Sequence, residues 1–240
     1  QPIFYAADPK WSYHLYLPKE FHTGRKWPVC FVMDPGGGGP GTLNRYIPAA
    51  EHLGIILAVS VESKNGFRDS DTAVTAMSED VFNRMPVIEE LAISSGMSGG
   101  SRMAYLLSEL DKNVVGVLAC GSGAGVYLSD GSFRPAKLRR GTVVCSLIGS
   151  NDFNRREAVK SHKGLGKDDR IIWFAGNHDW AGEDLILEGM ADVYGRVLMK
   201  SKASGIEPLR VAFSKSQLAR AKELEKTQPW LAHHWAEFLA

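Results

Sequence analysis

Hydrophobic residues gather along the chain in short uninterrupted runs, which are bounded by Gly, Pro, Asn or Asp. The runs are rich in Val, Ile and Leu, a pattern typical of strands that are covered on both faces of a parallel sheet. A further segment, residues 11–17, alternates between apolar and polar positions, which predicts an outer antiparallel strand. The uninterrupted runs lie at residues 28–33, 54–61, 90–95, 114–120, 142–148 and 170–175.

Segments with the hydrophobic spacing of helices separate these runs. In each segment the apolar residues recur every three or four positions, which places them on one face of a helix. Pro86 ends the first segment, because proline cannot continue a helix. The predicted helices lie at residues 72–84, 103–110 and 186–197, with two short helices in the tail at 214–240.

Strands that alternate with helices predict an α/β fold, with a mostly parallel central sheet and helices on both faces. A chain of 240 residues suits one such domain, so we expect a single domain over residues 1–240. The C-terminal helices, from about residue 208, are expected to pack on the body of this domain. The longest stretch without a clear element, residues 121–140, is predicted to form a small cap or loop over a site.

Charge and hydropathy narrow the classes of partner. Lys and Arg number 28 against 27 Asp and Glu, so the composition does not favour nucleic acid or an anionic membrane as a partner. The chain contains no apolar run of the roughly 18 residues that would span a bilayer. It begins at Gln1 and not at Met, which slightly favours a secreted or periplasmic protein over a cytoplasmic one.

The three cysteines, Cys30, Cys120 and Cys145, each lie in an apolar run. An odd number in a chain of this length does not indicate a disulfide framework, so we predict buried core thiols. One disulfide with one free thiol is the alternative. The sequence has no CxxC pair and no Cys and His cluster of the kind that binds zinc.

The strongest chemical signal is the pentapeptide Gly96-Met97-Ser98-Gly99-Gly100, which matches G-x-S-x-G. A serine at a sharp strand-to-helix turn needs glycine at the flanking positions, and the turn lifts its hydroxyl clear of the sheet. A Gly- and Ser-rich pentapeptide also occurs by chance, but here a predicted strand precedes it and a predicted helix follows. We therefore predict that Ser98 is a nucleophile and not a structural turn serine.

A serine nucleophile needs a general base, and a histidine base usually needs an acid that orients its ring. Of seven histidines, His178 stands out because it follows the last apolar run, at the sheet edge predicted for Ser98. Asp152 follows the fifth run in the same way and is the predicted acid, although an Asp at this place also commonly caps a turn. Asp179 is the rival acid, but a residue adjacent to the histidine rarely reaches its ring.

Acyl transfer also requires N–H donors that stabilise the oxyanion of the transition state. The backbone N–H of Gly99 is one predicted donor. The second is expected from the glycine-rich loop at residues 34–41, where Gly37 is favoured and Gly36 or Gly38 is equally arguable. This loop does not match a phosphate-binding P-loop, because it lacks the following Lys-Ser or Lys-Thr pair.

With these motifs, residues 10–200 resemble the α/β-hydrolase superfamily. Within it they are similar to the esterases of the polyhydroxybutyrate depolymerase-like, feruloyl esterase-like and dienelactone hydrolase-like group, and the chain order Ser98, Asp152, His178 is that of the superfamily. The resemblance implies an α/β-hydrolase fold and a compact esterase with little lid. The chain departs from the family at Asp34-Pro35, where the family often has His-Gly. The motifs that carry the resemblance are residues 36–39, 96–100, 149–152 and 176–180.

These features together predict a hydrolase that cleaves a small-molecule or polymer-attached carboxylic ester without a metal or an organic cofactor. A peptidase or acyltransferase of the same fold and a non-catalytic binding protein remain as alternatives. Phe153 and Trp180 flank the predicted triad, so they are expected either to line the substrate site or to serve packing. Arg102 is interpreted as a helix-surface residue or a structural ion-pair residue.

Overall fold

A computed structural model describes residues 2–128, 130–166 and 169–240 of the chain. Gln1, on which the expectation of secretion depends, lies outside the described residues. The chain divides into two compact units, one that ends at Val197 and one that runs from Leu198 to Ala240. The second unit contains the two expected tail helices, α6 (Glu207–Leu224) and α7 (Pro229–Leu239). Their packing on the body of the chain stays a prediction.

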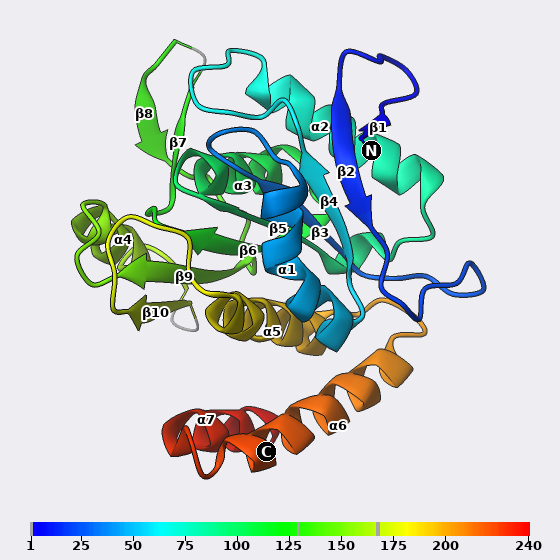
Figure 1. Ribbon diagram of the computed structural model, residues 1–240, viewed down its shortest axis with the longest axis vertical. Coiled ribbons are helices and arrows are strands. Elements are labelled where there is room, and N and C mark those ends of the chain that lie inside the picture. The colour runs from blue at the N-terminus through cyan, green and yellow to red at the C-terminus, as the bar shows by residue number, and fades with distance from the viewer. Residues whose placement is uncertain (1, 129, 167–168) are drawn as a thin grey trace. The chain divides into compact units, whose positions relative to one another are not determined.

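An eight-stranded sheet organises the first unit in the order β1-β2-β4-β3-β5-β6-β9-β10 (Figure 1). All pairs from β4 to β10 are parallel, whereas β2 is antiparallel to both β4 and β1. Every predicted strand is confirmed, and among the described strands of this sheet only the short β1 was not predicted. The strands are β1 (Ile3–Phe4), β2 (Ser12–Tyr16), β3 (Val29–Met33), β4 (Ile56–Ser60), β5 (Ala92–Met97), β6 (Val114–Cys120), β9 (Val143–Gly149) and β10 (Arg170–Phe174).

The helices of the first unit include the three that were predicted and two that were not. The unpredicted helices are α1 and α4, and α1 carries a proline inside it. No helix among the described residues is long and apolar enough to cross a membrane. The helices are α1 (Pro40–Leu53), α2 (Ser70–Arg84), α3 (Gly99–Leu110), α4 (Arg155–His162) and α5 (Glu183–Lys200).

Helices cover both faces of the sheet, as predicted, with α2 and α3 on one face and α1 and α5 on the other (Figure 1). Two neighbouring serines of β5 show this arrangement. The hydroxyl of Ser94 donates to the carbonyl of Ala104 in α3 at 2.9 Å. The hydroxyl of Ser95 points the opposite way and lies 2.8 Å from the hydroxyl of Tyr46 in α1.

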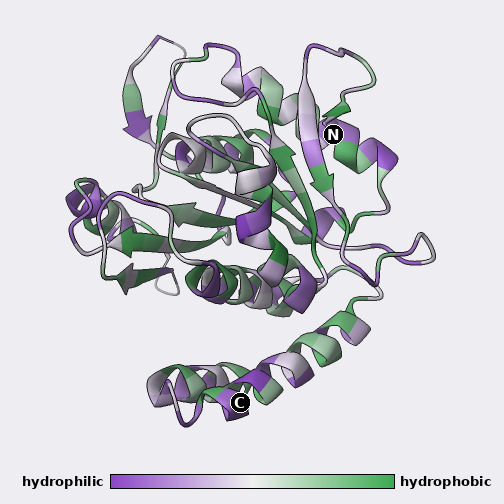
Figure 2. Cartoon of the chain, viewed as in Figure 1, coloured by the Kyte–Doolittle hydropathy of each residue, from purple (hydrophilic) through white to green (hydrophobic). Residues whose placement is uncertain are grey.

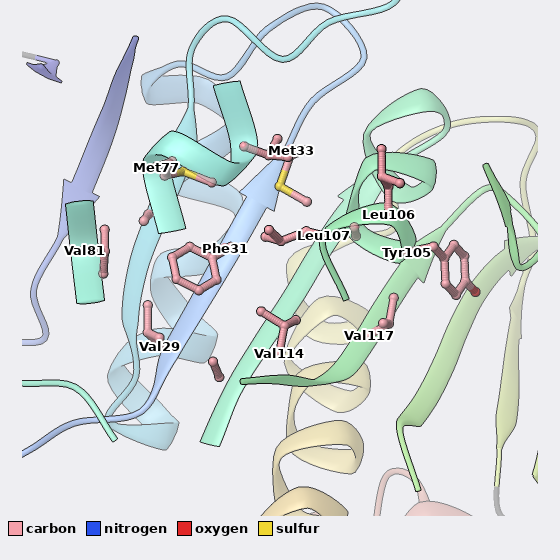
Figure 3. Close-up of a cluster of buried hydrophobic side chains, with 14 of the residues drawn as sticks. Val29, Phe31, Met33, Met77, Val81, Tyr105, Leu106, Leu107, Val114 and Val117 are labelled. Atoms are coloured by element: carbon pink, nitrogen blue, oxygen red, sulfur yellow. The ribbon is translucent and has the colours of Figure 1, made fainter. Parts of the chain in front are cut away.

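The core on the α2 and α3 face is continuous. Figure 3 shows Met77 and Val81 of α2 and Leu107 of α3 around Phe31 of β3, and all of these side chains are buried. Residues of β3 that point the other way, such as Cys30, are equally buried. Burial on both faces explains why strands such as β3 and β4 are hydrophobic at nearly every position. Figure 2 shows the hydrophobic character of the central sheet in green.

The segment at residues 121–140 contains a small antiparallel hairpin of β7 (Gly125–Tyr127) and β8 (Phe133–Pro135). Arg134 of this hairpin donates two hydrogen bonds to the carboxylate of Glu109 in α3, at 2.9 and 2.6 Å. The hairpin is therefore anchored on the helix that follows Ser98.

All three cysteines are free and buried. The prediction of core thiols is confirmed, and the alternative with one disulfide is wrong. Burial raises the pKa of Cys120 to about 12, and it raises the pKa values of Cys30 and Cys145 as well. Burial therefore disfavours the thiolate, which is the reactive form of cysteine.

Candidate active site

Ser98 occupies the sharp turn between β5 and α3, as predicted. Its φ of 53° is the only positive φ among the described residues other than glycine, and its backbone N–H donates to the carbonyl of Cys120 at 2.8 Å. A Cβ on Gly96 would lie 2.5 Å from the carbonyl oxygen of Met33, and one on Gly100 would lie 2.2 Å from the same oxygen. Both flanking positions therefore require glycine, because real Cβ atoms do not approach oxygen so closely.

The structure brings Ser98, His178 and Asp152 together from the ends of three strands. The Nε2 atom of His178 lies 2.8 Å from the Ser98 hydroxyl. The Nδ1 atom lies 3.0 Å from each carboxylate oxygen of Asp152. The Asp152 side chain is fully buried and that of His178 is 16% exposed, so the hydrogen-bonded series is screened from water at its acidic end. Asp152, and not the rival Asp179, is thus the carboxylate at the ring.

Further hydrogen bonds hold the two loops that carry the acid and the base. One Asp152 carboxylate oxygen also accepts the backbone N–H of Asn154 at 2.7 Å. The Cys120 thiol accepts the N–H of Ala181 at 3.4 Å and donates to the carbonyl of Asp179 at 3.7 Å. The two contacts with Cys120 hold the segment that follows His178 against the end of β6.

Three N–H groups of the glycine-rich loop, those of Gly36, Gly37 and Gly38, donate to acceptors in the loop itself or in β4. Gly37 donates to the carbonyl of Asp34 at 3.0 Å, and Gly36 donates to the carboxylate of Asp34 at 2.8 Å. Gly38 donates to the carbonyl of Ser60 at 2.9 Å. These partners do not favour Gly37, Gly36 or Gly38 as the second oxyanion donor, and that assignment stays a prediction. The loop uses these donors to close its own turn and to join β4.

Gly99 begins α3, where the first N–H groups of a helix have no partner within the helix and the helix dipole favours a negative charge. Its N–H suits an oxyanion donor, and this role stays a prediction. Sequence reasoning missed Asn65, whose side-chain oxygen would lie 1.7 Å from a Cβ on Gly99. Only contacts across the fold reveal Asn65, because no motif surrounds it in the sequence.

A cavity of about 990 Å³ opens in front of Ser98. It lies between the loop at residues 63–71 and the hairpin at 127–134, with one face of α3 along it. The predicted cap segment therefore does line the site. Its lining is mixed, with the apolar side chains of Phe67, Met103, Leu106, Leu110, Tyr127, Leu128 and Phe153 and the charged side chains of Asp34, Lys64, Arg68, Asp71, Arg102, Asp130 and Arg134.

The two aromatic residues predicted beside the triad have different surroundings. Phe153 is 74% exposed, lines the cavity, and its ring centre lies 4.0 Å from that of His178. Trp180 packs edge-on against Tyr46 at 6.0 Å, and it is not among the described residues that line the cavity. The packing alternative thus holds for Trp180, whereas substrate contact at Phe153 stays a prediction.

Arg102 is buried and forms a bidentate ion pair with Glu157 of α4, with N–O distances of 2.7 and 2.9 Å. Its guanidinium also lies 5.1 Å from the ring centres of both Tyr127 and Phe133 in the hairpin. The ion-pair interpretation is confirmed and the helix-surface one is wrong. Arg102 ties together α3, α4 and the hairpin at the cavity.

The described residues contain no group of three or more His, Cys, Asp or Glu side chains that could hold a metal ion. The expectation that the reaction needs no cofactor stays a prediction.

Several solved protein structures have a similar fold. No family model and no curated protein matches the chain. Among solved structures it is similar to a ferulic acid esterase, with a TM-score of 0.63 and 14% identity over 80% of this chain and 96% of that one. It is also similar to a fluorophosphonate-binding serine hydrolase of Staphylococcus aureus solved with substrate, with a TM-score of 0.57 and 12% identity over 77% and 92% of the two chains.

A third similar structure is a puromycin-hydrolysing peptidase of Mycobacterium tuberculosis, with a TM-score of 0.60 and 12% identity. It matches 83% of this chain, which spans only 39% of that protein. Sequence identities this low show a similarity of fold alone. The chain has the α/β-hydrolase fold, as its motifs implied, and its structural relatives include ferulic acid esterases.

Proposed function

We propose that this chain is a serine hydrolase that cleaves carboxylic esters through an acyl-enzyme on Ser98. The observation that carries the proposal is the hydrogen-bonded series from Ser98 through His178 to the buried Asp152, which opens on a cavity. The same geometry serves acyl transfer on unrelated folds, so it is recognised by the roles of its members and not by the fold.

The reaction follows from this geometry. The Ser98 oxygen attacks the ester carbonyl carbon while Nε2 of His178 takes the hydroxyl proton, and Asp152 stabilises the imidazolium through Nδ1. The negative charge on the former carbonyl oxygen receives a hydrogen bond from Gly99. Collapse expels the alcohol, which takes the proton from His178. Water then attacks the acyl-enzyme, passes a proton to the same nitrogen, and releases the carboxylic acid as Ser98 is restored.

The face of α3 along the cavity supports an ester with an extended apolar arm. Met103, Leu106 and Leu110 follow Gly99 on this face of the helix. At 1.5 Å per residue the face extends about 16 Å from Gly99, the residue after the nucleophile. A small-molecule ester with a long chain and a polymer-attached ester both fit a cavity of this form.

The first experiment compares Ser98→Ala with the parent on p-nitrophenyl acetate. Removal of a triad member typically lowers kcat by about 10⁴-fold or more, and we expect this loss with an unchanged thermal midpoint. Ser150, an exposed serine at the same sheet edge, provides the matched control, and Ser150→Ala should retain parental kcat. Parental activity in Ser98→Ala would exclude Ser98 as the nucleophile.

A substrate series tests the apolar arm. Leu110 is 56% exposed, so Leu110→Asp perturbs the cavity and not the core. We expect it to lower kcat/KM about 10-fold for p-nitrophenyl decanoate, since burying a side chain of this size contributes about 1.5 kcal/mol or more. Hydrolysis of the acetate should not change. Val159→Asp, at an exposed apolar position of α4 outside the cavity, is the control, and an equal loss there would contradict the proposal.

The similarity to a peptidase keeps amide hydrolysis as a second candidate activity. A panel of matched esters and anilides, with an added alcohol acceptor, separates esterase, peptidase and acyltransferase, because all three depend on Ser98. We expect the ester to have the highest kcat/KM.

A further inference from the structure

We propose that the side-chain amide of Asn65 donates the second hydrogen bond to the oxyanion. This inference rests on the proposed function, because the oxyanion forms only if Ser98 attacks a carbonyl. It assigns a catalytic residue that lies outside the glycine-rich loop and outside every motif in the sequence.

The need for another donor comes from the glycine-rich loop itself. The N–H groups of Gly36, Gly37 and Gly38 are all engaged within 3.0 Å by acceptors that belong to Asp34 or to β4. Use of any of them would break a hydrogen bond that closes the loop, and the displaced acceptor would lose its partner. A side chain that lines the cavity can supply a donor without this cost.

Asn65 has a fixed position relative to the nucleophile. Its backbone N–H donates to the carbonyl of Pro35 at 2.9 Å, and the preceding Lys64 forms an isolated bridge with Gly36. The turn continues with a hydrogen bond from the N–H of Phe67 to the carbonyl of Lys64 at 3.1 Å. Although the side chain of Asn65 is exposed, its backbone is therefore held against the loop that ends β3, at the edge of the sheet where Ser98 lies.

The Asn65 amide lies directly over Gly99, the first predicted donor. Its oxygen and nitrogen would lie 1.7 and 3.2 Å from a Cβ on Gly99, so the amide occupies the space that a side chain at this position would take. Asn65, Ser98 and Gly99 all line the same cavity. An oxygen bound by the Gly99 N–H is thus within reach of an amide that occupies the space beside it.

The direction of the amide is set by what it faces. The two ends of an asparagine amide differ little in shape, and a rotation of 180° exchanges the acceptor Oδ1 with the donor Nδ2. A developing negative charge favours the orientation that presents Nδ2. Such a hydrogen bond is made in the transition state and strengthens as charge develops, which is the condition for an effect on kcat.

The test uses Asn65→Asp and Asn65→Ala with p-nitrophenyl acetate. Asn65→Asp keeps the shape of the side chain but replaces the donor with a carboxylate oxygen. We expect kcat to fall about 100- to 1000-fold in both variants, the loss typical of one oxyanion donor, with KM within about twofold of the parent. The affinity for a phenylboronic acid, which forms a tetrahedral adduct with the serine, should fall in parallel. Asp69→Asn, at an exposed position of the same loop that is not among the described residues lining the cavity, should keep kcat within about threefold.

Parental kcat in Asn65→Asp would overturn the inference. So would a loss confined to KM with unchanged boronic acid affinity, because that pattern describes a substrate contact. If Asn65→Ala is less stable by circular dichroism, the isosteric Asn65→Asp decides. Labelling of the parent by a fluorophosphonate separates the two claims. If Ser98 in the parent is not labelled, the proposed function fails; if it is labelled while Asn65→Asp keeps full kcat, only the role of Asn65 fails.

Discussion

The proposed triad and the rim of the cavity lie at the same edge of the sheet, but they are built in different ways. Ser98, Asp152 and His178 each follow a strand of the parallel sheet within a few residues, so the sheet backbone sets their positions. The rim consists of the loop at residues 63–71 and the hairpin segment at 121–140, which side-chain contacts hold in place. The sheet therefore positions the proposed triad, whereas loops, which commonly vary more than the elements they connect, form the rim.

The largest expected effect distinguishes Asp152, the proposed acid, from the rival Asp179. Asp152→Asn keeps the shape of the side chain but no longer stabilises the imidazolium or holds the required tautomer, so we expect kcat to fall about 10⁴-fold. Asp179→Asn, one residue after His178 and exposed, should keep parental kcat. Steady-state kinetics on both variants check this. A larger loss of kcat in Asp179→Asn than in Asp152→Asn would show that Asp179, and not Asp152, is the acid.

The next effect tests the rigid region through stability. In Gly100→Ala the new Cβ meets the carbonyl of Met33 at 2.2 Å, and overpacking against backbone should lower the free energy of unfolding by about 3 kcal/mol. Gly41 in α1 has no atom within 4 Å of its Cβ position, so Gly41→Ala should be neutral or stabilising by about 0.5 kcal/mol. Urea denaturation of both variants measures the difference. Equal stability would show that the turn at Ser98 tolerates a side chain.

The smallest effect concerns the rim and its dependence on pH. Burial raises the pKa of Glu109, but the hydrogen bonds from Arg134 and from the backbone of Lys137 outweigh this and lower it overall. A lowered folded-state pKa adds stability above the unfolded value of about 4.3, and this stability is lost as pH falls through the folded value. We expect the parent to lose about 1 kcal/mol more than Glu109→Gln between pH 7 and pH 3. Equal losses in thermal denaturation would show that this pair does not anchor the hairpin.

The contrast between residues at the ends of strands and residues of the rim also explains which features the sequence predicts. The strands are predictable because burial on both faces leaves an uninterrupted hydrophobic run. The meeting of Ser98, Asp152 and His178 is predictable because each of them follows such a run. α1 was missed because Pro40, Gly41 and Pro48 interrupt its helical pattern.

Features that depend on contacts across the fold were not predictable. The glycine-rich loop indicated an oxyanion donor, but the sheet brings Ser60 of β4 to Gly38, and Asp34 turns back to Gly36 and Gly37. The sequence does not indicate Asn65 either, because its proximity to Gly99 arises only when two separate elements come together in the fold. Local motifs in the sequence therefore predict the residues of the proposed triad, but they do not predict the contacts that form the rim.

The most direct test of the central claim is covalent labelling by a fluorophosphonate, followed by peptide mapping. The account predicts one label per chain on the peptide that carries Ser98, no label in Ser98→Ala, and slower labelling in Asp152→Asn, because His178 then no longer activates the hydroxyl. A label on any other residue, or an unlabelled folded parent, would contradict the assignment of Ser98 as the nucleophile.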